Sequence, residues 1–227
     1  MNKPITLYHG SDHIVRTPVF GAGSPHNDYG LGFYCTESLE LAKEWACKSP
    51  SLGMANRYDF DPAGFSVMDL TSKQYNILNW LAILLENRSF DAKGPLPAQS
   101  RAYIVDNFLP PYQDADVIKG YRADDSYFAY ARDFVNNTIS LGQLSRAMNL
   151  GNLGVQIVLK SKAAVESLRF VDAETADGGI YFPKRQARDS AARSAYFSLR
   201  TDPASPEAVF AIDILRQKLT NDSPLLR

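Results

Sequence analysis

Cysteine is scarce in this sequence, and the way the two cysteines are placed excludes two kinds of protein. Cys35 and Cys47 are the only two among 227 residues. Two cysteines are too few for the disulfide framework of a small secreted domain, and their spacing matches no common metal site. The three histidines, His9, His13 and His26, add no metal-ligand spacing. We therefore expect a protein without a bound metal, from a reducing compartment.

Long apolar runs and an excess of one charge are also missing. The best apolar stretch, residues 77–85, is shorter than the run of about 18 residues that marks a membrane span, and it contains Asn79. Residues 1–4 lack the apolar segment of a signal peptide, so we expect a cytoplasmic protein. A formal net charge of -1 predicts no general attraction to nucleic acid. The basic stretch 184–193 is more typical of a solvated helix face.

The patterns that are present indicate a single domain of the α+β class. Short apolar stretches predict strands at residues 4–8, 33–35, 58–61, 65–70, 116–121, 154–159 and 169–173. The third and fourth of these strands are expected to pair across a turn. Helical periodicity predicts an insertion at about 71–112, helices at 127–136, 141–150 and 162–168, and C-terminal helices at 187–198 and 206–218, within about 180–220. The lack of regular strand–helix alternation favours α+β, and no glycine-rich turn predicts a Rossmann site.

Two short glycine-bearing segments are the most informative part of the chain. The first is Leu7-Tyr8-His9-Gly10-Ser11, and the second is residues 28–36, which contain the turn Gly30-Leu31-Gly32 followed by Phe33-Tyr34. Each combines a short strand, a polar aromatic group and glycines, which let a ligand ring lie close to bare backbone. This combination is typical of the wall of a nicotinamide pocket.

Together these segments resemble the ADP-ribosyltransferases with a His-Tyr-Glu signature, the superfamily of poly-ADP-ribose polymerases and diphtheria toxin. Small, toxin-like bacterial members match best. The resemblance covers roughly residues 4–70 and 152–174. It implies a fold of split antiparallel β-sheets with a helical insertion, and NAD bound as a substrate in the cleft between the sheets.

The resemblance also implies roles for individual residues. His9 would bond the adenosine ribose, and the backbone of Gly10 would hold the nicotinamide carboxamide. Tyr34 would pack on the nicotinamide ring, with Trp45 as a second stacking aromatic. Ala42 stands where eukaryotic members have a carboxamide-binding serine. The remaining residues expected in the NAD site are Tyr8, Ser11, Gly32, Phe33 and Thr36.

The third signature residue departs from the family. Gln156, on the expected strand 154–159, stands where the family has its glutamate. An amide can accept a hydrogen bond from the ribose but carries no full negative charge, so single transfer is favoured over chain building. Gln156 could equally be a structural residue of the strand. Asp124 or Asp125 could supply the missing charge, although acidic residues there also suit a helix start.

The sequence therefore predicts an NAD-dependent mono-ADP-ribosyltransferase, with His9, Tyr34 and Gln156 as its catalytic residues. The resemblance to toxin-like members implies a toxin–antitoxin or phage-defence role and a small antitoxin protein as partner. Two alternatives remain open at this point. One is a catalytically silent module that binds NAD or ADP-ribose, and the other is an RNA 2'-phosphotransferase-like enzyme, which the near-neutral charge disfavours. The acceptor could be protein, nucleic acid or a small molecule.

Overall fold

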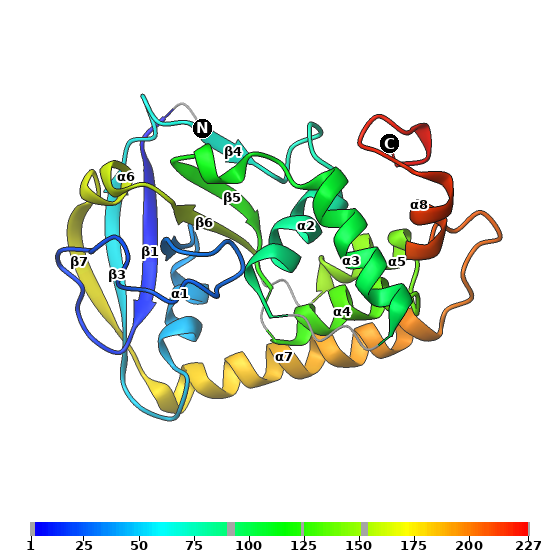
Figure 1. Cartoon of the computed structure of the whole chain (residues 1–227). Helices are drawn as coiled ribbons and strands as arrows, with labels where there is room; N and C mark the ends of the chain where they lie inside the picture. Colours follow the sequence, from blue (N-terminus) through cyan, green and yellow to red (C-terminus); the bar gives the residue numbers. More distant parts are fainter. Residues whose placement is uncertain (1–2, 90–93, 124, 151–153, 227) are drawn as a thin grey trace.

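Two small β-sheets form one end of the molecule, and helices form the other (Figure 1). The computed structural model describes residues 3–89, 94–123, 125–150 and 154–226. One sheet has three antiparallel strands in the order β1 (Ile5–Ser11), β3 (Gly53–Phe60) and β7 (Arg169–Ala176). The other has four strands in the order β2, β6, β5 and β4. Their bounds are Phe33–Cys35, Val155–Leu159, Val117–Tyr121 and Val67–Asp69. The α+β class is confirmed.

The second sheet corrects two expectations. β4 pairs with β5 in parallel, so this sheet is mixed and not purely antiparallel. The expected pairing of residues 58–61 with 65–70 is wrong, because β3 is already bonded on both edges by β1 and β7. Hydrogen bonds between Ser66, just before β4, and Asp116, just before β5, hold the starts of these two strands together. The Ser66 backbone N–H donates to the Asp116 carboxylate at 2.9 Å, and the Asp116 N–H donates to the Ser66 hydroxyl at 2.9 Å.

An isolated backbone bridge links the two sheets, which also share a core. The backbone N–H and C=O groups of Tyr8 and Thr36 exchange hydrogen bonds of 2.8 and 2.9 Å, which joins β1 to the end of β2. Apolar side chains of both sheets and of α6 (Lys162–Glu166) pack beneath this junction. The fully buried ones include Leu7, Tyr58, Ile157 and Leu159. Their burial fixes how the sheets face each other.

The expected helical insertion consists of α2 (Ile77–Asn87) and α3 (Pro95–Phe108). Residues 78–85 of α2 are all buried, and they pack with Met68, Ile118 and Val158 on the face of the second sheet opposite the shared core. Helices α4 (Asp125–Val135), α5 (Leu141–Ala147) and α8 (Ala211–Gln217) extend this second core. The 3-10 turns Tyr112–Asp114 and Pro224–Leu226 complete the described elements. No helix of the described ranges is long and apolar enough to cross a bilayer.

Helix α1 (Leu39–Ala46) lies directly against β1. Ser38 caps its first turn by accepting a hydrogen bond from the backbone N–H of Leu41. A side chain at Gly10 would place its Cβ 2.1 Å from the Ala42 carbonyl oxygen and 2.7 Å from the Ala46 nitrogen. Only a glycine allows the strand and helix backbones to approach this closely. The glycine expected to border a ligand therefore also has a packing role.

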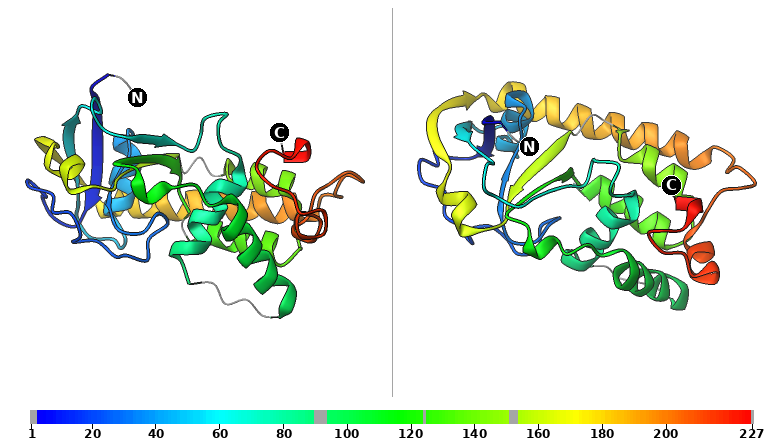
Figure 2. Two further views of the ribbon diagram at one scale, coloured as in Figure 1. Left: turned by 45° about the horizontal axis from the view of Figure 1, so that its top comes forward. Right: turned by 90° about the horizontal axis from the view of Figure 1, so that it is seen from above.

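Helix α7 (Gly178–Thr201) runs the length of the molecule and connects its two ends (Figures 1 and 2). Asp177 caps it, and it begins earlier than the expected helix at 187–198. Near its middle, Arg188 pairs with the buried Glu44 of α1. Towards its end, the Tyr196 ring stacks on Tyr130 of α4 at 3.7 Å. The sheet end and the helical end are thus both attached to α7.

Candidate functional site

His9 is held in one orientation and in one tautomer. Its ring stacks on Phe33 with a centroid distance of 4.4 Å, and its Nδ1 lies 2.8 Å from the backbone carbonyl of Tyr34. Because a carbonyl only accepts, Nδ1 carries the proton, and Nε2 of the neutral ring is an acceptor. Burial lowers the pKa of His9, which favours this neutral form. The residue can therefore accept a hydrogen bond from a hydroxyl group.

Gly10 presents a backbone edge that the sheet leaves free. Tyr8 uses its N–H and C=O for Thr36, so these groups point away from β3. In an antiparallel ladder this direction recurs every second residue, so the N–H and C=O of Gly10 point the same way. Beside Gly10 no strand continues the pairing, because β2 ends at Cys35 and the chain then enters α1. No side chain or loop backbone of the described ranges bonds either group. A donor and an acceptor side by side match a carboxamide.

Tyr34 links His9 to the loop of residues 28–32. Its backbone carbonyl faces His9, while its hydroxyl donates to the Gly30 carbonyl at 2.7 Å and accepts from the Tyr29 N–H at 3.1 Å. Lys160 closes the same loop by donating to the Tyr29 carbonyl, and burial lowers the pKa of this lysine to about 8. The Tyr34 hydroxyl is thus used within the protein, and its half-buried ring is the part left for a ligand.

Trp45 already has a cation on one face. The guanidinium of Arg122, which follows β5, lies 4.6 Å from the centre of the indole. The indole Nε1 is buried and bonds no atom of the described residues. A ligand ring would therefore stack on the other face of Trp45 or displace Arg122.

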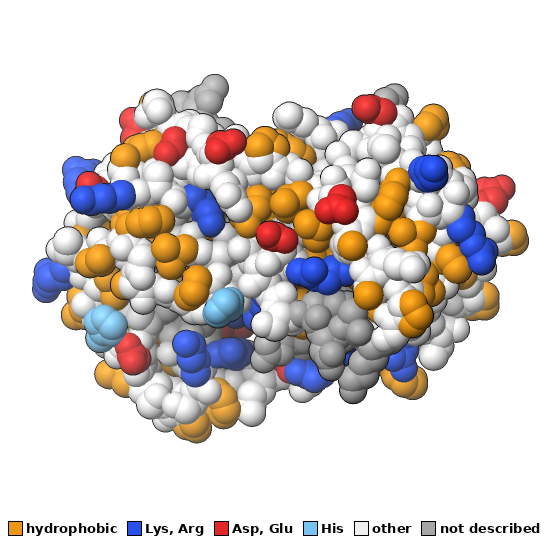
Figure 3. Space-filling view, in the orientation of Figure 1, with side chains coloured by type: hydrophobic (Ala, Val, Ile, Leu, Met, Phe, Trp, Pro, Cys, Tyr) orange, Lys and Arg blue, Asp and Glu red, His pale blue; other side chains and the backbone are white. Residues whose placement is uncertain are grey.

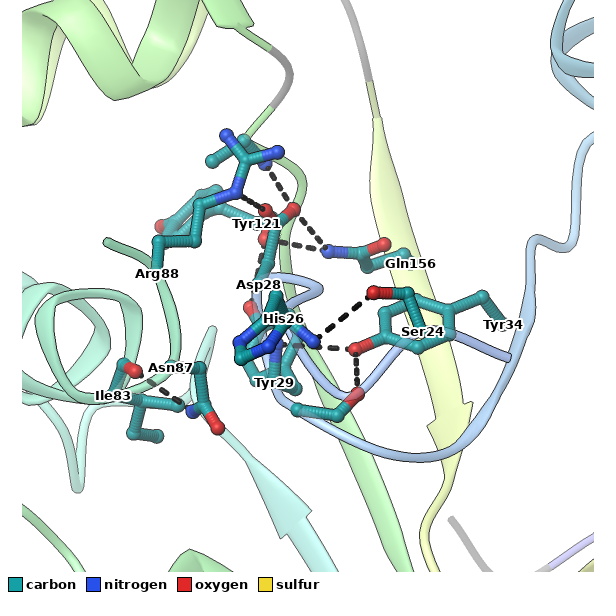
Figure 4. Close-up of polar contacts among 12 residues, drawn as sticks. Ser24, His26, Asp28, Tyr29, Tyr34, Ile83, Asn87, Arg88, Tyr121 and Gln156 are labelled. Atoms are coloured by element: carbon teal, nitrogen blue, oxygen red, sulfur yellow. Dashed lines mark hydrogen bonds and ion pairs between the residues drawn. The ribbon is translucent and has the colours of Figure 1, made fainter. Parts of the chain in front are cut away.

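Gln156 is buried, and its amide nitrogen is occupied. The side chain is 3% exposed, and Nε2 donates to the Asp28 carboxylate at 3.1 Å and to the Tyr121 carbonyl at 3.3 Å. Figure 4 shows the amide turned towards these two acceptors. Both partners accept, which fixes the amide orientation and leaves Oε1 on the opposite side. Within the described part of the chain, Oε1 accepts no hydrogen bond.

Asp28 is the main site residue that sequence reasoning missed. Its carboxylate is 7% exposed, accepts from the Ala123 N–H at 2.8 Å and lies 3.3 Å from Nε of Arg88 (Figure 4). Burial raises the pKa of Asp28, and the charge of Arg88 acts against that rise. Asp28 is the first residue of the second glycine-bearing segment, but its partners lie 60 to 128 residues away in the sequence. No local sequence pattern therefore predicts them.

Comparison with known proteins gives a family but no activity. Residues 5–170 match the family model described as "Protein of unknown function (DUF3990)". The chain belongs to this family. No curated protein and no solved structure matches it. The match to the DUF3990 model includes every residue of the candidate site and ends within β7, so α7 and α8 lie beyond it.

The structure brings most of the predicted NAD-site residues of this DUF3990 member to the junction of the two sheets. Some of their polar groups are already engaged. The Ser11 hydroxyl donates to the His13 carbonyl and accepts from the Asn56 amide, and the Thr36 hydroxyl accepts from the Ser38 N–H. Gly32 lies against β6, because a Cβ there would be 2.6 Å from Val158. These residues shape the junction and leave the ligand-facing chemistry to others.

The remaining predicted residues lie elsewhere or outside the description. Asp124 is outside the described residues, as is the side chain of Asp125. The described residues contain no cluster of three metal-binding side chains. Of the basic stretch, Lys184, Arg188 and Arg193 each form an ion pair with an acidic side chain. On the face shown in Figure 3, basic and acidic side chains are interspersed.

Proposed function

We propose that this protein is an NAD-dependent mono-ADP-ribosyltransferase. In this reaction the bond between ribose C1′ and the nicotinamide nitrogen breaks, and its electron pair neutralises the positive pyridinium. A nucleophile of the acceptor then bonds to C1′ and releases its proton to solvent. The protein must therefore hold nicotinamide, orient the ribose and stabilise positive charge on it.

The free backbone edge of Gly10 is the observation that carries the proposal. Its N–H and C=O point to one side without a partner in the described ranges. Ala42 and Ala46 of α1 pack on the same glycine, and Trp45 comes from that helical turn. A carboxamide can accept from this N–H and donate to this C=O while its ring lies on an aromatic. Ala42 has no hydroxyl to offer, so the Gly10 edge would hold the carboxamide without that bond.

Two further groups support the proposal. His9, neutral and with a free acceptor, suits a hydroxyl of the adenosine ribose. Gln156, with Oε1 turned away from Asp28, suits a hydroxyl of the nicotinamide ribose. An amide supplies no full charge of its own, so we propose transfer of one ADP-ribose without chain growth.

The occupied amide of Gln156 also favours a second candidate. Because Nε2 is committed to Asp28 and Tyr121, Gln156 can be a structural residue. The protein would then be a silent module that binds NAD or ADP-ribose. The RNA 2'-phosphotransferase alternative needs basic groups directed at a phosphorylated RNA. The basic groups of the site have other contacts, since Arg88 pairs with Asp28, Arg122 lies on Trp45 and Lys160 donates to the Tyr29 carbonyl.

Incubation with labelled NAD tests both candidates. We expect the wild-type protein to release nicotinamide and, in a cell lysate, to attach a single ADP-ribose to an acceptor that mass spectrometry identifies. Binding of NAD without nicotinamide release favours the silent module, and absence of binding contradicts both. We further propose a toxin role in the cytoplasm with a small antitoxin. Growth arrest on expression, relieved by co-expression of a neighbouring gene product, tests that role.

A further inference from the structure

The buried Asp28–Gln156 pair joins two segments that lie 128 residues apart in the chain. Asp28 is 7% and Gln156 is 3% exposed, and the carboxylate oxygen lies 3.1 Å from the amide nitrogen. A hydrogen bond to an ionised acceptor is stronger than one between neutral groups, and exclusion of water strengthens it further. The pair is therefore a specific contact in the interior of the site.

The surroundings hold both members in place. The Tyr121 carbonyl, the second acceptor for Gln156, also accepts from the Tyr29 hydroxyl at 2.7 Å and from the Trp80 indole at 3.1 Å. On the other side, Arg88 and the Ala123 N–H bind the Asp28 carboxylate. Oε1 of Gln156 is thereby fixed in direction, with no bond to any described residue.

We propose that Asp28 and Gln156 together do what a single glutamate does in the family that the sequence resembles. This inference rests on the proposed transferase function. Gln156 Oε1 accepts from a hydroxyl of the nicotinamide ribose. Asp28, behind it, polarises the amide and places negative charge close to the ribose as the C1′–N bond breaks. No proton moves between the two side chains. Asp28 is therefore a positioning residue that acts through Gln156.

Steady-state release of nicotinamide from NAD tests this pair. Asp28→Asn keeps the shape of the side chain but removes its charge, and we expect kcat to fall about 10- to 100-fold with KM for NAD changed less than about threefold. Gln156→Glu alone puts two carboxylates in contact, and we expect a lower thermal midpoint. The double variant Asp28→Asn/Gln156→Glu exchanges carboxylate and amide, and we expect kcat within about tenfold of wild type.

Glu44→Gln is the matched control. Glu44 is another buried carboxylate, 3% exposed, paired with an arginine, and it faces α7. If loss of a buried ion pair alone lowered kcat, this variant would lose as much as Asp28→Asn, which would overturn the inference. We expect it to lose stability with kcat nearly unchanged.

The outcomes separate this inference from the proposed function. Wild-type protein that neither binds NAD nor releases nicotinamide overturns both. An active wild type with kcat unchanged in Asp28→Asn overturns only the role of Asp28. If the kcat of the double variant does not exceed that of Gln156→Ala, Asp28 is only a structural support. This outcome also overturns the inference. Should Asp28→Asn not fold, the double variant still tests the pair, because a kcat no higher than that of Gln156→Ala would overturn the inference.

Discussion

At the scale of single residues, a hydrogen bond to a carbonyl determines what His9 can do. The Tyr34 carbonyl requires the proton on Nδ1, and burial keeps the ring neutral, so Nε2 accepts. Protonation of Nε2 removes this acceptor, so a ribose hydroxyl could then bind only by accepting from the ring N–H, and the ring would carry a charge in a buried position. The role of His9 in NAD binding can therefore be tested by changing the pH, without knowing which molecule accepts the ADP-ribose.

We expect NAD affinity to fall with decreasing pH because of His9. The folded-state pKa lies below the ordinary value of 6.5, so affinity holds through pH 6.5 and falls only at lower pH. The same shift gives stability that is present above 6.5 and lost as pH falls through the lowered pKa. Calorimetric titration of NAD from pH 7.5 to 5 measures this. His9→Gln should remove the acid-side loss, whereas His13→Asn, at an exposed site, should retain it.

Replacement of Trp45 tests the aromatic contribution to binding. Stacking contributes roughly 0.5–1.5 kcal/mol beyond burial, so Trp45→Ala should weaken NAD affinity by about threefold to tenfold. Trp45→Phe retains a ring and should lose less. Equal affinity in wild type and a folded Trp45→Ala variant would remove Trp45 from the site.

At the scale of elements, local patterns were enough to place most strands and helices, but not their partners. Residues 33–35 form the expected strand, and helices lie where the helical period predicts them. The partner of β4 depends on Ser66 and Asp116, 50 residues apart, and on the occupied edges of β3. Helical periodicity does not predict the start of α7, because Gly178, Gly179 and Pro183 are poor helix formers whose position the Asp177 cap and tertiary packing determine.

The contact between β1 and α1 gives a prediction about stability. In Gly10→Ala the new Cβ would lie 2.1 Å from the Ala42 carbonyl oxygen, which is backbone and cannot rotate away. We expect a loss of roughly 1–3 kcal/mol or more in the free energy of unfolding, measured by urea denaturation. Gly142→Ala is the control. Nothing lies within 4 Å of its Cβ position on α5, so this variant should be neutral or stabilised by up to about 1 kcal/mol.

At the scale of the whole molecule, α7 connects the sheets to the helical end, although it lies beyond the residues that match the family model. Its contact with α1 is a two-bond ion pair, in which Arg188 donates to both carboxylate oxygens of Glu44 at 2.8 Å. Because Glu44 is buried, the pair fixes α7 beside the helix that carries Trp45. A groove of roughly 660 Å³ borders the same pair.

Removal of this ion pair should destabilise the whole fold. Arg188→Ala leaves the buried Glu44 carboxylate without these two donors, and we expect a loss of about 1–3 kcal/mol in the free energy of unfolding. Lys184→Ala removes the neighbouring pair with Glu40, which is exposed on both sides, and should cost less than about 1 kcal/mol. Denaturant midpoints of the two variants provide the comparison. Equal midpoints would show that the α7–α1 ion pair contributes no more than a surface contact.

The candidate site was predictable only in part, because some of its contacts join residues that lie far apart in the sequence. His9, Gly10 and Tyr34 lie in two short continuous segments, and Trp45 follows Tyr34 by 11 residues, so a local resemblance was enough to single them out as candidates. Asp28 gains its partners from β6, from Ala123 after β5 and from Arg88 after α2, which only the folded chain brings together. Buried contacts between polar residues far apart in the sequence produce no helical or strand periodicity, so the sequence pattern does not predict them.

Nicotinamide release from NAD is the most direct test of the central claim. Purified wild-type protein, incubated with NAD and a cell lysate as the source of acceptor, should release nicotinamide. Gln156→Ala should release nicotinamide at least about 100-fold more slowly than the wild type. Release by the wild type no greater than that by heat-denatured protein would contradict the assignment of this chain as a transferase.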